Sequence, residues 1–301
     1  MFKFKGRDIL SIKDFSKEEI LYILKLANKF EKKVNPNLLK GKIVATLFYE
    51  PSTRTHQSFS SAAQRLGAGV IGFDNINVTS IKKGESFQDT LKIMANLSDV
   101  IVIRHPNIGS ADLAAETVSI PVINAGDGPN NHPSQTLLDL YTIQKVFKRL
   151  DNLKIAMVGD MKHYRTFHGQ ILGLKKFSNN KIYGICPKGL KMPDEFKDKN
   201  YQDVVINMKD LDKTLAELKP DIVSLGRIPK EYIKGNSEKY SFKITMETIK
   251  KLPKHTIIMH PLPRIDELAT EVDNHPSAIY FQQAKNGLYI REALLTLVLG
   301  K

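Results

Sequence analysis

Residues 43–66 read IVATLFYEPSTRTHQSFSSAAQRL. The apolar, β-branched run Ile43–Phe48 predicts a strand, and residues 53–66 carry apolar side chains at helical spacing. A short polar turn joins the two elements and contains Ser52, a residue type favoured at the start of a helix. Because a strand, a polar turn and an amphipathic helix form the repeating unit of a parallel α/β sheet, this stretch predicts an α/β fold.

The same alternation continues on both sides of this stretch. In the first half, further strands are expected at 70–73, 100–104 and 121–124, and helices at 17–30, 86–97, 111–118 and 133–147. After Leu150 the alternation restarts, with strands expected at 154–159, 181–186, 204–207, 221–225 and 256–259, and helices at 166–177, 209–218 and 288–299.

The restart predicts two doubly wound parallel-sheet domains joined by bridging helices. We expect the first domain to comprise residues 1–134 and the second residues 135–284, with a C-terminal helix at 285–301 packing back on the first. A length of 301 residues is sufficient for two buried cores. The helix at 133–147 ends near the turn residues Asp151 and Asn152 and is expected to bridge the domains.

The composition is that of an ordinary globular protein, with 42% hydrophobic and 26% charged residues. The single cysteine, Cys186, excludes an intrachain disulfide and a cysteine-based zinc site formed by this chain alone. No apolar run approaches the roughly 18 residues of a membrane span, and residues 1–10 carry charges where a signal peptide would be apolar. We therefore expect a cytoplasmic protein with no membrane partner.

The formal net charge of +13 lies mainly in residues 141–301 and is carried mostly by dispersed lysines. This pattern favours a solvated lysine-rich surface over an arginine-rich stripe that binds nucleic acid. The same charge would steer a small anionic substrate toward the protein.

The turn after the first quoted strand, Ser52-Thr53-Arg54-Thr55, has the chemistry of an anion site. The free N–H groups and the dipole at a helix N-terminus attract phosphate, and an arginine adds a bidentate donor. An ordinary capped helix is the alternative interpretation. Neither GxxxxGK[ST] nor GxGxxG occurs at such a position, so no nucleotide cofactor is indicated.

Three further polar clusters follow predicted strands. They are Ser80-Ile81-Lys82-Lys83-Gly84-Glu85, Arg104-His105-Pro106 and His132-Pro133-Ser134-Gln135. Each one alone could be a solvated loop or a structural histidine. Ligands of open α/β sheets collect at the carboxyl ends of the strands, so clusters that recur there favour a binding site.

These motifs, together with His260-Pro261-Leu262-Pro263-Arg264, resemble the aspartate/ornithine transcarbamoylase family, and within it the catalytic chains that use aspartate. The resemblance extends over essentially the whole chain, from Gly6 to Ala284. It implies transfer of the carbamoyl group from carbamoyl phosphate to the α-amine of L-aspartate, in pyrimidine biosynthesis. It also implies a homotrimer with active sites shared between subunits, and no cofactor or metal. The sequence leaves open whether a separate regulatory chain is a further partner.

The resemblance assigns a role to each matching residue. For the donor, the catalytic residues are Arg54, Thr55, Arg104 and His132, and the binding residues are Ser52, Thr53 and Gln135, with Ser80 and Lys83 supplied by a neighbouring subunit. For the acceptor, the binding residues are Arg165 and Arg227, and the backbone carbonyls of Pro261 and Leu262 face the substrates. Two arginines after strands suit a substrate with two carboxylates, although either could be a structural ion pair.

The chain departs from the family pattern at four positions. Pro229 and Tyr232 replace a glutamine and an arginine of the aspartate-recognition loop, Tyr164 replaces a glycine, and His56 replaces an arginine. Because proline lacks the glutamine amide, we expect the reaction rate to show a weak or unusually shaped dependence on aspartate concentration. Three alternatives stay open: an ornithine-type carbamoyltransferase, a basic nucleic-acid-binding module and a non-catalytic scaffold.

Overall fold

A computed structural model describes residues 2–228 and 240–300. Within them the chain divides into two compact units, one of residues 1–141 with Lys285–Lys301 and one of Thr142–Ala284. The division falls inside α5 (Pro133–Phe147) and α9 (Tyr280–Val298), so both helices contribute to both units. Each unit contains one parallel sheet, as expected for two α/β domains.

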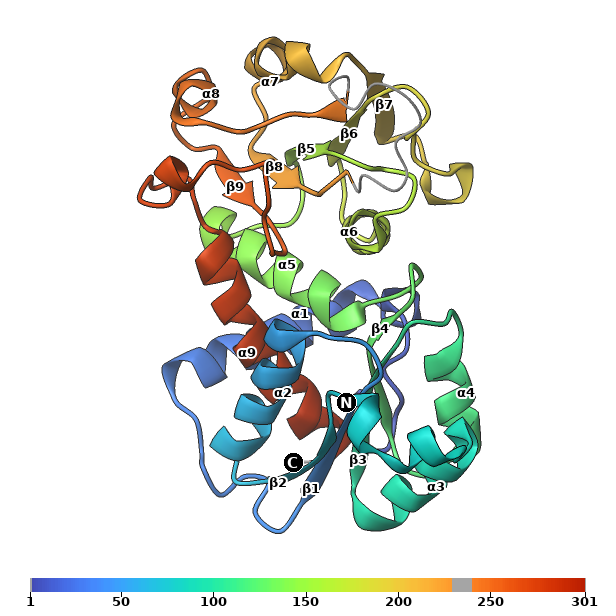
Figure 1. Ribbon diagram of the computed structural model, residues 1–301. Coiled ribbons are helices and arrows are strands. Elements are labelled where there is room, and N and C mark those ends of the chain that lie inside the picture. Colours follow the sequence, from blue (N-terminus) through green and yellow to red (C-terminus); the bar gives the residue numbers. More distant parts are fainter. Residues whose placement is uncertain (1, 229–239, 301) are drawn as a thin grey trace. The chain divides into compact units, whose positions relative to one another are not determined.

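The first unit is built on sheet A, whose described strands have the order β2-β1-β3-β4. The strands are β1 (Ile43–Phe48), β2 (Gly69–Phe73), β3 (Val100–His105) and β4 (Val122–Asp127). The helices that precede or connect them are α1 (Lys17–Lys32), α2 (Thr53–Arg65), α3 (Phe87–Leu97) and α4 (Ser110–Thr117). Figure 1 shows α3 and α4 on one face of sheet A and α2 and α9 on the other.

Local sequence explains where these helices begin. Ser16 and Glu19 form a capping box at the start of α1, and the Ser86 hydroxyl accepts the Asp89 N–H at the start of α3. The faces that α3 and α4 turn to the sheet carry Leu91 and Ala114, which are buried against Ile101 and Ile103 of β3. Burial of this apolar surface is the main force that holds the layers together.

The C-terminal half of α9 packs into the first unit. The carboxylate of Glu292 is fully buried and lies 2.6 Å from Nε of Arg65. The guanidinium of Arg291 lies 5.1 Å from the ring centroid of Phe59, and burial lowers its pKa to about 9. The N–H of Gly6 donates to Val298 O at 2.8 Å, so both ends of the described chain meet in this unit.

The second unit is built on sheet B, whose described strands have the order β7-β6-β5-β8-β9. The strands are β5 (Lys154–Val158), β6 (Lys181–Cys186), β7 (Tyr201–Val205), β8 (Ile222–Leu225) and β9 (Ile257–Met259). The helices are α6 (Arg165–Leu174), α7 (Leu211–Leu218) and α8 (Met246–Lys250). Leu215 of α7 and Ile249 of α8 join one core cluster with Val223 of β8.

None of the described helices combines the length and the apolar composition that crossing a bilayer requires.

Candidate active site

The predicted donor residues follow the strands of sheet A at a single edge. The strands are parallel, with Phe48 of β1 opposite Arg104 of β3 and Leu47 opposite Phe73 of β2. Carboxyl ends of parallel strands meet at one edge of a sheet. The turns after β1, β2, β3 and β4 therefore begin at the same edge. Three of the predicted clusters lie in or after these turns, and Arg104-His105-Pro106 spans the end of β3.

The turn after β1 leads directly into α2, with Ser52 as the N-cap. Among the described residues the Ser52 side chain makes no capping hydrogen bond to the helix. The first backbone bond of the helix runs from the His56 N–H to Ser52 O at 3.0 Å, so the N–H groups of residues 53–55 precede it. Thr53 and Arg54 are exposed and Thr55 is buried. This geometry suits an anion at the helix N-terminus.

Arg104, the fifth residue of β3, is held by both neighbouring strand ends. Its Nη2 lies 2.6 Å from Glu50 Oε1, and its Nη1 donates to Ala125 O at 3.3 Å. The side chain is largely shielded from solvent. A guanidinium fixed by a carboxylate and a carbonyl is a preorganised donor at this edge.

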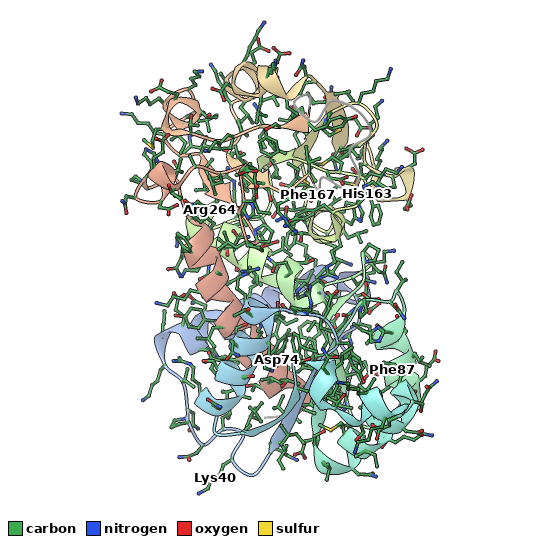
Figure 2. The ribbon with its side chains drawn as sticks, viewed as in Figure 1. Lys40, Asp74, Phe87, His163, Phe167 and Arg264 are labelled. Carbon is green, nitrogen blue, oxygen red and sulfur yellow. The ribbon has the colours of Figure 1, made fainter. Side chains whose placement is uncertain are left out.

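His105 has a packing role in the structure. Its ring lies 4.8 Å from Tyr49 and 5.0 Å from Phe87, which is labelled in Figure 2. Burial lowers the pKa of His105, and its Nδ1 accepts the N–H of Asn107 at 3.1 Å. Burial also raises the pKa of Tyr49 to about 12. The aromatic group is therefore neutral and supports the edge beside Arg104.

Asp127, which sequence reasoning did not single out, organises the loop between β4 and α5. The buried carboxylate accepts hydrogen bonds from the Asn124 amide at 2.9 Å, the Asn131 N–H at 2.8 Å and the Gly109 N–H at 3.1 Å. Two loops of the edge are fixed through this one side chain, and the β4–α5 loop carries His132.

His132 and Gln135 lie at the start of α5. His132 is buried, with its Nδ1 3.4 Å from the Ser134 hydroxyl. The Gln135 Nε2 donates to Asp139 Oδ1, one helical turn further on, at 3.0 Å. A carboxylate oxygen accepts and an amide NH₂ donates, so Asp139 turns the Gln135 amide nitrogen toward itself and leaves Oε1 as the acceptor. Asp139 was also not singled out from the sequence.

Ser80 and Lys83 lie in a single 3₁₀ turn, Ser80–Lys83, after β2. Both side chains are exposed, as is that of Lys82 between them. His56, which replaces the family's arginine, lies in α2 with Nε2 3.2 Å from Thr46 Oγ1 and Nδ1 3.5 Å from Asp74 Oδ2.

In the second unit, Asp160 folds the turn that carries Arg165. Its fully buried carboxylate accepts the N–H groups of Lys162 at 2.9 Å and His163 at 3.0 Å, and its Oδ2 lies 2.9 Å from His163 Nδ1. Arg165 is the first residue of α6. His163 of this turn and Phe167 of α6 are labelled in Figure 2.

Arg165 and Arg227 follow neighbouring strands, because Val158 of β5 pairs with Leu225 of β8 in parallel. The two strand ends approach closely: the Gly226 N–H donates to Val158 O at 2.9 Å. Gly159 has φ +138°, and a Cβ there would lie 2.2 Å from Gly226 O. Glycine at 159 is therefore needed for the close approach.

Tyr164, which replaces the family's glycine, packs beside the turn that carries Arg227. A Cβ on Gly226 would lie 2.7 Å from the Tyr164 ring and 2.7 Å from the Phe167 ring, and the two rings are 5.0 Å apart edge to face. Pro261 and Leu262 follow β9, which is parallel to β8, at the same edge. Pro229 and Tyr232 lie outside the described residues.

Both units therefore place arginines and hydroxyl or amide groups at the carboxyl edge of a parallel sheet. Within the described residues, no group of three or more histidine, cysteine or acidic side chains is placed to hold a metal ion. Fold and site together define a class of α/β protein whose sheet edges, with their arginines and helix N-termini, suit small anionic ligands.

Comparisons with known proteins identify the family. Residues 7–145 match the model of the aspartate/ornithine carbamoyltransferase carbamoyl-P binding domain, and residues 151–298 match that of the Asp/Orn binding domain. The chain belongs to the aspartate/ornithine carbamoyltransferase family, which is a family of transferases. The resemblance found in the sequence is thereby confirmed.

Among relatives, the aspartate carbamoyltransferase catalytic subunit of Thermococcus onnurineus is 47% identical, over 99% of this chain and 98% of its own length. The catalytic subunit of M. jannaschii aspartate transcarbamoylase has a similar structure, with 44% identity, a TM-score of 0.86, and 96% and 97% of the two chains covered. Trypanosoma cruzi aspartate transcarbamoylase in complex with N-(phosphonacetyl)-L-aspartic acid has 33% identity and a TM-score of 0.91, with 99% and 97% covered.

Proposed function

We propose that this chain is an aspartate carbamoyltransferase, which transfers the carbamoyl group of carbamoyl phosphate to the α-amine of L-aspartate in pyrimidine biosynthesis. The products are N-carbamoyl-L-aspartate and phosphate. The observation that carries the proposal is the pair of arginines, Arg165 and Arg227, which follow neighbouring strands of sheet B. They suit an acceptor with two carboxylates, in a chain whose other sheet edge suits a phosphate.

The phosphate of the donor would bind at the N-terminus of α2. Its oxygens accept hydrogen bonds from the first-turn N–H groups, from the Ser52 and Thr53 hydroxyls, and from the guanidinium of Arg54. Ser52 supports this role because its hydroxyl makes no capping bond to the helix among the described residues.

The carbamoyl group would lie between Thr55, Arg104, His132 and Gln135. As the amine attacks, negative charge develops on the carbamoyl oxygen, where Thr55, Arg104 and His132 donate hydrogen bonds. The orientation that Asp139 gives to Gln135 leaves Oε1 to accept from the carbamoyl NH₂. The new C–N bond forms, the C–O bond to phosphate breaks, and the amine proton passes to the departing phosphate. The transfer therefore needs positioning and electrostatics, and it requires neither a metal nor a cofactor.

The acceptor would bind at the edge of sheet B. In this proposal Arg165 binds the α-carboxylate of aspartate and Arg227 its side-chain carboxylate. The backbone carbonyls of Pro261 and Leu262 face the substrates. An ornithine-type acceptor is disfavoured because its cationic side chain would be repelled by Arg227.

The proposal is tested by an assay with carbamoyl phosphate and either L-aspartate or L-ornithine. We expect N-carbamoyl-L-aspartate to form and citrulline not to form. Product from ornithine alone would identify the other branch of the family, and donor binding without any product would favour a scaffold. Nucleic-acid affinity that falls steeply with salt, in place of donor binding, would favour a nucleic-acid-binding module.

We also propose a cytoplasmic homotrimer in which Ser80 and Lys83 complete the site of a neighbouring subunit. Their exposure on a single 3₁₀ turn supports this assembly. The buried thiol of Cys186 suits a reducing compartment. A separate regulatory chain is compatible with this assembly, and neither nucleic acid nor a membrane is a proposed partner.

Lys83→Ala should raise the half-saturation concentration of carbamoyl phosphate and lower turnover, because one cation that faces the dianionic donor is lost. Lys82→Ala is the matched control, since Lys82 is the adjacent exposed lysine of the same turn. Steady-state kinetics of both variants, with size-exclusion chromatography, make the comparison. Equal effects of the two substitutions would contradict the assignment of Lys83.

Mixing tests whether sites are shared. Subunits with Arg54→Ala and subunits with Lys83→Ala, each impaired alone, should regain activity when dissociated and reassociated together. Each mixed trimer then contains a site made from the unaltered parts of two chains. Activity that stays at the level of the separate variants would show that Lys83 serves its own chain.

A further inference from the structure

The loop after β9 is braced by a buried histidine and a buried glutamate. The N–H of His260 donates to Gln283 Oε1 at 2.9 Å, and its Nε2 lies 2.8 Å from Glu267 Oε1. The N–H of Leu262 donates to His260 Nδ1 at 2.8 Å. His260, Glu267 and Gln283 are all buried, and the loop that they enclose also carries Arg264 (Figure 2).

These contacts determine the tautomer of His260. A backbone N–H only donates, so Nδ1 must accept from Leu262 and carries no proton. The proton is then on Nε2, which donates to Glu267. Both ring nitrogens are occupied and the side chain is fully buried, so His260 is not placed to exchange protons with a substrate.

Glu267 joins the two ends of the loop. Its Oε2 accepts the N–H groups of Ile265 at 3.2 Å and Asp266 at 3.1 Å, while its Oε1 accepts from His260. Burial raises the pKa of Glu267, but the hydrogen bond from His260 and those from the backbone outweigh this effect and leave the pKa below its usual value. The side chain is therefore a carboxylate.

Leu262, at the centre of this network, has φ +57°, in the left-handed region that leucine rarely adopts. Such a conformation persists only where surrounding contacts impose it, and these positions cluster at functional sites. Leu262 itself is held by its N–H bond to His260 Nδ1 and by the packing of its side chain against the core of the second unit. The Leu262 N–H and the Pro261 C=O belong to one planar peptide unit, so the direction of the Pro261 carbonyl depends on the imidazole. The imidazole in turn is held by Glu267.

We propose that His260 and Glu267 are positioning residues, which hold the Pro261 carbonyl in the direction needed to receive the acceptor substrate. This inference rests on the proposed function, in which that carbonyl faces the substrates. The chain of contacts runs from the Ile265 and Asp266 backbone through Glu267 and His260 to Leu262.

Two substitutions at His260 test whether its side chain positions the loop or only fills buried space. His260→Ala removes both ring contacts, and we expect kcat to fall by about 10²-fold, the cost of a misplacement of about 1 Å in an active site. In His260→Asn the side-chain oxygen can accept the N–H two residues on, as in an Asx turn, and so restores the bond to Leu262. We expect this variant to recover most of kcat. Equal kcat values for the two variants would overturn the proposal.

Glu267→Gln should lower kcat with little change in the half-saturation of carbamoyl phosphate, because the donor residues lie in the first unit. Asp266→Asn is the matched control, since Asp266 is the adjacent carboxylate and its side chain is exposed. Active sites are counted by titration with N-(phosphonacetyl)-L-aspartic acid, so that loss of folded protein does not count as loss of kcat. A Glu267→Gln kcat equal to that of Asp266→Asn would overturn the role of Glu267.

A spectroscopic measurement keeps the test independent of activity. In the ¹⁵N NMR spectrum of the intact wild-type protein with labelled histidine, assigned by comparison with His260→Asn, we expect Nε2 to be protonated and Nδ1 to be unprotonated at neutral pH. An imidazolium or an Nδ1–H tautomer would overturn the inference. Absence of product from the wild-type enzyme would instead overturn the proposed function while leaving the tautomer result intact.

Discussion

Arg54→Ala should lower the turnover of carbamoyl phosphate by about 10²- to 10³-fold or more, the loss that follows removal of one preorganised donor to developing charge. The guanidinium lies in the first turn of α2, where the helix N-terminus already attracts an anion. The side chain is exposed, so we expect the melting temperature to change little. Steady-state kinetics and thermal melting are the measurements.

Arg54→Lys and Gln57→Ala are the companions of this variant. Lysine keeps the charge but lacks the planar fork that binds two phosphate oxygens, so intermediate activity is expected. Gln57 is an exposed residue of the same helix, and its truncation should leave turnover unchanged. If Arg54→Ala kept turnover within tenfold of wild type, the phosphate would have to bind elsewhere.

Gly159→Ala should be strongly destabilising, by about 3–5 kcal/mol in the free energy of unfolding. Gly159 has φ +138°, and an added Cβ would lie 2.2 Å from Gly226 O and 2.9 Å from Gly226 C. Backbone of both strand ends must move to relieve this clash. Because Arg227 follows Gly226 directly, the half-saturation concentration of aspartate should also rise, while that of carbamoyl phosphate should not.

Gly189→Ala is the matched control for this effect. Gly189 lies in the same unit with φ +93°, and among the described atoms nothing lies within 4 Å of its Cβ position. It carries only the cost of a left-handed alanine, about 1–2 kcal/mol. Denaturant unfolding of both variants separates the free-energy cost of the steric clash from the cost of the left-handed backbone conformation. Equal destabilisation would show that the approach of β5 to β8 tolerates a methyl group.

Hydrophobic patterning predicted the fold class correctly because the sheets are buried between helices. The strand Ile43–Phe48 and the helix Pro133–Phe147 have the predicted bounds. The prediction for the edge strand was shifted: it was expected at 204–207 and spans Tyr201–Val205, where Gln202 and Asp203 interrupt the apolar run. The final helix begins at Tyr280, whereas the prediction began it at residue 288. The polar residues Gln282 and Gln283 interrupt the apolar pattern in its first turns, so the pattern did not indicate them.

Helix α8 was missed because it has five residues, too few to show a helical period, and depends on a capping box between Thr245 and Thr248. The unit division falls between Tyr141 and Thr142, whereas the sequence placed it after residue 134. A continuous helix gives no local signal for the point at which its packing partners change.

The candidate site divides in a similar way. Residues that would touch substrate could be proposed from the sequence because they lie at or after strand ends and have polar or charged side chains, and their roles stay predictions. The side chains that hold these loops, such as Asp127, Asp139, Asp160 and Glu267, were missed. Their partners are backbone N–H groups or residues brought near by the fold, and no spacing rule applies to a bond such as that from the Gly109 N–H to Asp127.

The return of Lys285–Lys301 to the first unit has a consequence for synthesis on the ribosome. Nascent domains usually fold in the order in which they emerge, at about 5–20 residues per second. Here the second unit, Thr142–Ala284, is completely synthesised before the last residues of the first unit. Those residues include Glu292, which pairs with Arg65, and Val298, whose carbonyl accepts the Gly6 N–H. Translation of the N-terminal half is therefore complete about 10 to 30 s before α9 is available to pack against it. During that interval the face of α2 that α9 later covers is exposed to chaperones.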